Sequence, residues 1–214
     1  MCLYLRQVNV SPQVMLGHAK GLQHHNIIIQ FNAHKVFTKT IVAGVLSDVS
    51  INFLEGIYPK LVIVGLVDHA AYTGTYNKSP YNFQHFDVSE CALTNNGQSI
   101  PSTPYRPNFD KKMYAKEYFN MFQQLSRCGM FADDNGITLE DWADGKTLYT
   151  FNLAPDLAIT GHAQAVRYTN INIELSFAKE TPKNLQLIAL AVYDTQLEET
   201  REGHWLLDPT QQPN

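Results

Sequence analysis

Short apolar stretches with a period of two residues, separated by turn-forming residues, are the main pattern of this chain. From Asn170 to Phe177 apolar residues alternate with polar ones, which is typical of a strand with one buried and one solvated face. Leu185–Tyr193 is apolar at nearly every position, and so is Leu61–Val67. Strands of that kind are covered on both faces, so both segments are predicted to lie in the middle of a sheet.

Further strand-like segments are spread along the chain. They are Leu3–Val10, Val36–Val42, Phe86–Thr94, Gln98–Ile100 and Thr147–Leu153, while Val45–Leu54 fits either a strand or an ordered loop. Asn95–Gly97 predicts a tight hairpin, because Asn and Gly tolerate positive φ angles. Pro101, Pro104 and Pro107 are expected to prevent regular structure until about Asp110.

Helical patterns interrupt the strands at a few places. Ser11 followed by Pro12 predicts the start of a short helix that ends near Gly21. Met113–Cys128 carries apolar residues at three- and four-residue spacing and is predicted to be an amphipathic helix inserted in a β connection. The four residues from Thr138 to Asp141 resemble a capping box that opens a very short helix.

Many short strands with few helices predict an all-β antiparallel sandwich or barrel, with one or two short helices in its connections. Regular alternation of strands and helices is absent, so a doubly wound fold is not expected. One domain is predicted to span residues 1–195. The charged and then Pro- and Gln-containing segment 196–214 is expected to be a flexible tail.

The composition narrows the classes of partner. Charged residues make up 17% of the 214 residues, below the roughly 25% of average soluble chains, which indicates that partners cover part of the surface. The net charge of -4, with no basic cluster longer than Lys111–Lys112, argues against specific nucleic-acid binding. No apolar run is long enough to insert in a membrane.

The cysteines and the amino-terminal residues indicate the cellular compartment in which the protein is expected. Cys2, Cys91 and Cys128 are odd in number and widely spaced, so they are predicted to be free thiols in a reducing environment. The first ten residues lack a basic region followed by a long apolar one, so they do not resemble a secretory signal. The protein is therefore expected inside cells rather than secreted.

One enzymatic hypothesis follows from histidine and carboxylate spacing. His85 and Asp87 are two residues apart on a predicted strand, so their side chains would share a face. With His162 they would supply the two histidines and one carboxylate of an Fe(II)-dependent oxygenase or cupin-like enzyme. A polar strand edge explains the same residues, and no phosphate loop, serine elbow or paired Cys-x-x-Cys occurs. No catalytic, cofactor or metal residue is therefore assigned, and the chain is predicted not to be an enzyme.

Aromatic residues concentrate in two loops and indicate contact with a partner. Tyrosine and phenylalanine side chains supply large, rigid contact areas at subunit interfaces. The candidate interface residues are Tyr72, Tyr76, Tyr81, Phe83, Tyr105 and Phe109. Two alternatives stay open: the rings fold back onto their own sandwich, or the exposed tyrosines bind a glycan or a peptide.

Several segments, in order, resemble one family. They are NVSPQVMLGHAKGL, PKLVIVGLVDHAAYTGTYNKSPYNFQHFDV, IPSTPYRPNF, KEYFNMFQ, DGKTLYTFNLAPDL and NIELSFAKETPKNLQLIALAVYD. Together they span roughly residues 8 to 194 and are similar to the double jelly-roll major capsid proteins of Polinton (Maverick) elements and adintoviruses.

The resemblance implies a fold and a role. It implies a jelly-roll antiparallel β-sandwich, the second of two rolls, with a piece of the first roll or of the linker. It further implies a structural protein without catalysis or cofactor that self-associates, as a homotrimeric capsomer, with other capsid proteins in a virion-type shell. The protein is then expected in the virion or in the interior of the host cell, in its cytoplasm or nucleus.

Overall fold

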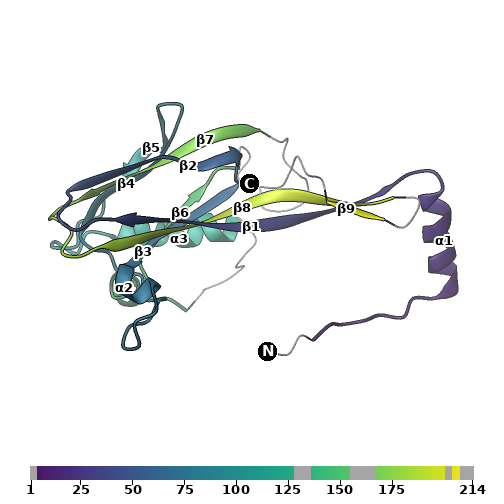
Figure 1. Cartoon of the computed structure of the whole chain (residues 1–214), viewed down its shortest axis with the longest axis horizontal. Helices are drawn as coiled ribbons and strands as arrows, with labels where there is room; N and C mark the ends of the chain where they lie inside the picture. Colours follow the sequence, from purple (N-terminus) through teal and green to yellow (C-terminus); the bar gives the residue numbers. More distant parts are fainter. Residues whose placement is uncertain (1–3, 128–135, 155–166, 201–203, 208–214) are drawn as a thin grey trace. The chain divides into compact units, whose positions relative to one another are not determined.

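A computed structural model describes residues 4–127, 136–154, 167–200 and 204–207 (Figure 1). The chain divides into two compact units. Met1–Phe31 with Thr195–Gln212 form the first, called the terminal unit below. Asn32–Asp194 with Pro213–Asn214 form the second, the sandwich unit.

Strands outnumber helices among the described residues. The described strands are β1 (Ile27–Ile41), β2 (Ser47–Ile57), β3 (Leu61–Asp68), β4 (Val88–Asn95), β5 (Gln98–Tyr105), β6 (Leu148–Asn152), β7 (Tyr168–Phe177), β8 (Leu185–Glu199) and β9 (Trp205–Leu207). The described helices are α1 (Pro12–Leu22), α2 (His69–Tyr72), α3 (Ala115–Arg127) and α4 (Leu139–Ala143).

The strand order is that of a jelly roll. One sheet has the order β1-β8-β3-β6 and the other β2-β7-β4-β5, so most consecutive strands lie in opposite sheets. Apart from the β4–β5 hairpin and the β8–β9 pair, strands adjacent within a sheet are far apart in the sequence, as when a long antiparallel ribbon wraps around a core. Figure 1 shows the sheets as two layers. The predicted fold class, a jelly-roll antiparallel β-sandwich with short helices in its connections, is confirmed.

The core lies between the two sheets. β7 alternates as predicted, with Ile171, Ile173, Leu175 and Phe177 buried. β3 and β8 are paired antiparallel along Leu61–Asp68, and β6 pairs with the other edge of β3. A strand flanked on both sides and covered on both faces must be apolar throughout, which explains the sequence of β3.

The outer face of the first sheet is covered by the chain's own connections. A Cβ on Gly65 of β3 would lie 2.6 Å from Cδ1 of Phe83 and 2.9 Å from Cδ2 of Leu148, so only a glycine lets the Phe83 ring pack there. Helix α3 packs against β6 and buries Met121 and Leu125. The predicted amphipathic helix between strands is thereby confirmed.

Some sequence predictions were wrong at the sheet margins. Tyr4–Val10 forms no strand in this chain. β5 continues to Tyr105 through Pro101 and Pro104, where loss of regular structure was expected. It does so because β5 is the edge of its sheet, where a residue without an N–H group need not break a ladder. The hairpin was predicted correctly: Asn96 and Gly97 have φ angles of 50° and 77°.

The terminal unit contains α1 and the distal parts of β1 and β8. Helix α1 begins after Ser11 with Pro12 in its first turn, as predicted, but none of its residues is buried. β8 runs past the predicted domain boundary to Glu199, and β9 pairs with its end. Nε2 of His18 lies 3.5 Å from the Glu199 carboxylate within this unit.

Candidate interaction site

The loop after β3 is held by a cluster of polar contacts around Asp68. The Asp68 carboxylate accepts a hydrogen bond from the Ala70 backbone N–H at 2.9 Å, which caps α2. Its other oxygen lies 2.6 Å from Nζ of Lys78 and 2.8 Å from Nζ of Lys183. Burial alone would raise the pKa of the Asp68 carboxyl, but these hydrogen bonds from Lys183, Lys78 and Ala70 hold it well below its usual range. The Lys78 side chain is thereby held at the start of its loop, where β3 ends.

Three tyrosines on this loop point to solvent. Tyr72 is 45% exposed, Tyr81 is 79% exposed and Tyr76 is fully exposed. Their loop is held at its start by the Asp68 contacts and at its end by the Phe83 backbone, which exchanges hydrogen bonds with Gly145 and Thr147 at 2.9 and 2.8 Å. The sequence therefore places aromatic rings on a fixed loop without burying them in the described chain.

The other three predicted interface residues make contacts within the chain. Phe83 is half-buried over Gly65. Tyr105 is buried, and its hydroxyl donates to the backbone oxygen of Thr150 at 2.7 Å, so its side chain is not a surface contact. Phe109 is half-buried and stacks on His85 with ring centroids 4.0 Å apart.

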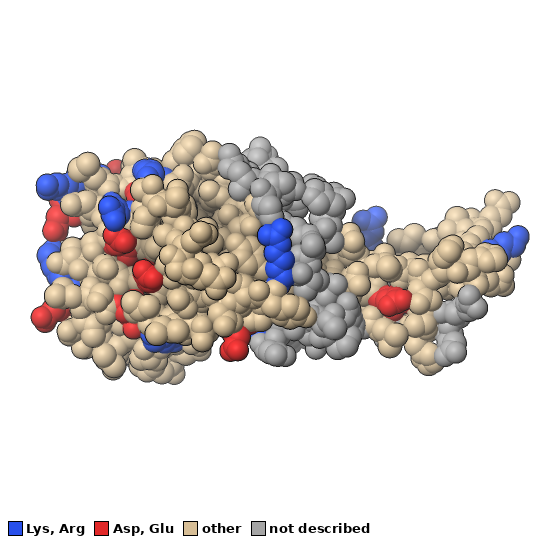
Figure 2. Space-filling model, turned by 90° about the horizontal axis from the view of Figure 1, so that it is seen from above, with Lys and Arg blue, Asp and Glu red and all other residues tan. Residues whose placement is uncertain are grey.

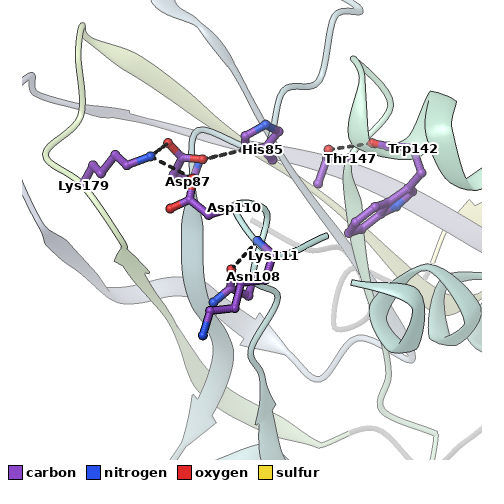
Figure 3. Close-up of polar contacts among 8 residues, drawn as sticks. All are labelled: His85, Asp87, Asn108, Asp110, Lys111, Trp142, Thr147 and Lys179. Atoms are coloured by element: carbon purple, nitrogen blue, oxygen red, sulfur yellow. Dashed lines mark hydrogen bonds and ion pairs between the residues drawn. The ribbon is translucent and has the colours of Figure 1, made fainter. Parts of the chain in front are cut away.

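His85 and Asp87 lie in a turn beside the loop that carries Asn108 and Asp110 (Figure 3). The Asp87 backbone N–H donates to Nδ1 of His85 at 2.9 Å. Nζ of Lys179 lies 3.0 Å from the Asp110 carboxylate and 3.5 Å from that of Asp87, so it joins two loops. Phe86 and Asp87 both have positive φ angles, 42° and 52°, which are uncommon for residues with a side chain.

The protonation state of His85 follows from this geometry. Burial lowers the pKa of the His85 imidazole, against the opposing effect of the Asp87 carboxylate. An Nδ1 atom that accepts a hydrogen bond carries no proton, so the neutral ring bears its proton on Nε2. The approach of 3.3 Å between Nδ1 and the Asp87 carboxylate becomes an ion pair only when the ring is protonated.

The structure does not favour the iron-site hypothesis. The prediction that His85 and Asp87 share one face of a strand was wrong, because β4 begins only at Val88. Nδ1 of His85 already accepts a hydrogen bond, and Lys179 places a cation against the Asp87 carboxylate. His162 lies outside the described residues. Among those that are described, no three His, Cys, Asp or Glu side chains form a group that could hold a metal ion.

A hollow of about 340 Å³ lies next to this turn. It is lined by three connections, which contribute charged residues of both signs: Asp87, Asp144 and Glu180, and Lys179 and Lys183. Ligand pockets are mainly apolar with a few polar groups, so this mixed lining is better suited to polar contact with a partner. Figure 2 shows charged side chains gathered at the end of the sandwich unit that carries the β7–β8 turn in Figure 1.

Sequence reasoning missed both polar clusters. Lys183 is 115 residues from Asp68 in the sequence, and Lys179 is 92 residues from Asp87. A charge pattern read along the chain carries no signal for such pairs. Only the pairing of β8 with β3 brings Lys183 to Asp68, and only the pairing of β7 with β4 brings Lys179 to Asp87.

Sequence comparison finds a relative that is longer than this chain. No protein-family model matches the sequence. An uncharacterized protein of Caenorhabditis elegans is 28% identical over 138 residues, which cover 64% of this chain and 33% of that protein. The chain thus spans about a third of the length of the curated relative it matches.

Solved structures with similar folds come from viral capsids. PBCV-1 Vp54 has a TM-score of 0.49 at 11% identity, over 93% of this chain and 54% of Vp54. The mavirus major capsid protein has a TM-score of 0.43 at 11% identity (87% and 42% covered), and a Sputnik virophage chain 0.46 at 16% identity (86% and 39%). Because these TM-scores are below 0.5, the jelly-roll assignment rests on the strand order of this chain itself.

None of the described helices is long and apolar enough to cross a membrane.

Proposed function

We propose that this chain is a non-enzymatic structural subunit that self-associates through its loops into a virion-type shell. The observation that carries the proposal is the braced loop with exposed Tyr72, Tyr76 and Tyr81. Holding an aromatic ring in water on an ordered loop gives no folding benefit, whereas a preorganised ring loses little entropy when a partner covers it. The jelly-roll strand order supports the same role, because viral capsid domains are one of the main uses of that architecture.

The finer parts of the proposal concern assembly and origin. We expect a homotrimeric capsomer, further contacts with other capsid proteins, and location in the virion. Affiliation with Polinton (Maverick) elements or adintoviruses is supported by the resemblance of the sequence segments.

Sedimentation across a range of concentrations tests self-association. The wild-type chain of 24.2 kDa is expected to form a species of three times that mass at high concentration. Replacing two exposed rings, Tyr76→Ser with Tyr81→Ser, is expected to weaken association at least tenfold, because each ring supplies interface area that serine lacks. A wild-type chain that stays monomeric at several hundred micromolar would refute the proposal.

Tyr168→Ser is the matched control. Tyr168 is 68% exposed but lies at the start of β7, outside the loop after β3 that carries Tyr72, Tyr76 and Tyr81 (the tyrosine loop). The same chemical change there is expected to leave association within about threefold of the wild type. Equal weakening by both changes would mean that tyrosine content in general, and not this loop, drives association.

A further inference from the structure

The outer edges of the two sheets differ in their protection against a further strand. β2 has an irregular register between Ser50 and Leu54, with a positive φ angle at Asn52, and such bulges hinder pairing. β5 lacks the N–H groups of Pro101 and Pro104. β6 is a short strand, and α3 packs against it. Three of the edges therefore carry features that discourage strand addition.

The edge of β1 carries none of these features in the described chain. Its sequence, IIIQFNAHKVFTKTI, has no proline and many β-branched residues, and among the described strands β1 pairs with β8 alone. Val36 is 58% exposed. Lys39, a charge that could guard the edge, is held by the Asp48 carboxylate at 2.9 Å. An extended edge of this kind offers unpaired backbone N–H and C=O groups to another strand.

The chain also contains a segment with a strand-like sequence that does not pair with any described strand. Tyr4–Val10 has the residue pattern of a strand, yet it forms no regular structure here. Its apolar side chains are exposed, from 50% at Val10 to 92% at Tyr4. A sequence that favours a strand but has no neighbouring strand among the described residues is suited to complete a sheet elsewhere.

We propose that Tyr4–Val10 of one copy adds as a strand to the β1 edge, along Asn32–Ile41, of a second copy. This inference rests on the self-association proposed above and names the surface that carries part of it. A segment of this length spans about 23 Å as a strand, which fits within that part of β1. Backbone hydrogen bonds would hold the segment, and alternate side chains would cover apolar residues of β1 such as Val36.

Charge favours encounters between copies of the chain. No Asp or Glu occurs before Asp48, so the segment and the helix after it carry only the positive charges of Arg6 and Lys20. From Asp48 onward the chain holds all 20 acidic residues and 12 of the 16 basic ones, so that part is net negative. Opposite charge on the segment and on that net-negative part speeds encounters between copies. The acceptor stretch Asn32–Ile41 itself carries Lys35 and Lys39 and no carboxylate, so charge steers the encounter and backbone pairing would hold the segment.

The size of the contact sets the expected strength. A strand of seven residues covers less than the roughly 800 Å² per partner of a standard interface. One such contact is therefore weak alone and becomes effective when copies exchange segments reciprocally or sit side by side in an assembly.

Two substitutions at one position test backbone pairing. Val8→Pro removes an N–H group, whereas Val8→Thr keeps that group and the β-branched shape. Val8 is exposed and outside regular structure, so neither change is expected to unfold the chain. Sedimentation should show association weakened at least tenfold by Val8→Pro and less than threefold by Val8→Thr. The opposite order would overturn strand pairing in favour of a purely apolar contact.

A photo-cross-linking residue at position 8 locates the acceptor strand. In a mixture of ¹⁴N- and ¹⁵N-labelled full-length protein, cross-linked peptides of mixed isotope composition should join position 8 to Asn32–Ile41. Links of unmixed composition would mean pairing within one copy and would overturn the inference. Oligomers without links to β1 would overturn it while leaving the proposed function intact. A monomeric chain without mixed links would refute both.

Discussion

At the scale of single residues, Gly65 shows how one position fixes the place of a loop. It lies in the central strand β3, and its missing side chain gives the Phe83 ring direct access to the sheet. Phe83 in turn is tied by its backbone to Gly145 and Thr147. An aromatic residue that could have faced a partner is therefore used to set the end of the tyrosine loop.

Gly65→Ala is expected to destabilise the sandwich by about 1–3 kcal/mol. The added methyl group would overlap the Phe83 ring and Leu148, so the loop must shift or the strand must bend. Denaturant unfolding measures the loss. Gly17→Ala in α1 is the control, because nothing lies within 4 Å of its Cβ position, and it should leave the unfolding of the sandwich unit unchanged. An unchanged midpoint for Gly65→Ala would show that Phe83 moves away freely.

At the scale of elements, short polar contacts decide where strands stop. β3 ends at Asp68, whose carboxylate caps α2 and binds two lysines. β4 begins only after the turn at Phe86 and Asp87, although the alternation of its sequence starts earlier. In both cases a local hydrogen-bonding option competes with continuation of the strand.

Asp68→Asn and Asp68→Ala separate the two roles of this carboxylate. Asn keeps a capping oxygen and loses the charge for Lys78 and Lys183, whereas Ala loses both, so Ala is expected to cost about 1 kcal/mol more. The folded state lowers the pKa of Asp68, so its stabilisation is fully present above the unfolded pKa of about 4 and is lost progressively as the pH falls from there through the lower folded pKa. Unfolding at pH 7 and pH 3 measures this. The difference in unfolding free energy between the wild type and Asp68→Asn should be smaller at pH 3 than at pH 7. An equal difference at both pH values would contradict the ion-pair role.

At the scale of the whole molecule, burial is distributed unevenly between the units. The sandwich unit has a continuous apolar core that includes the centres of β3, β7 and β8. In the terminal unit, α1 has no buried residue, and an isolated helix of 11 residues is marginal in water. The two units are therefore expected to differ in local stability.

Amide hydrogen exchange at low protein concentration is expected to show this difference. Backbone amides of Val62, Val64 and Ala189 should exchange slowest, because they lie in buried ladder strands. Peptides covering α1 and Tyr4–Val10 should exchange within seconds. Raising the concentration should slow exchange in Tyr4–Val10 and along β1 if the segment docks on another copy. Protection of α1 equal to that of β3 at the lowest concentration would contradict the expectation.

The sequence alone determined most strands, the hairpin at Asn96, the helices α1, α3 and α4, and the all-β class. These features follow from residue periodicity and local turn chemistry, which act over a few residues. The tertiary structure decided the burial of Tyr105, the turn at His85 and the ion pairs of Asp68 and Lys179, because those depend on which distant loops the jelly-roll order brings together. It also showed that the strand-like sequence Tyr4–Val10 pairs with no strand in the part of the chain that the structure describes, since a strand needs a neighbour and no local signal says where that neighbour is.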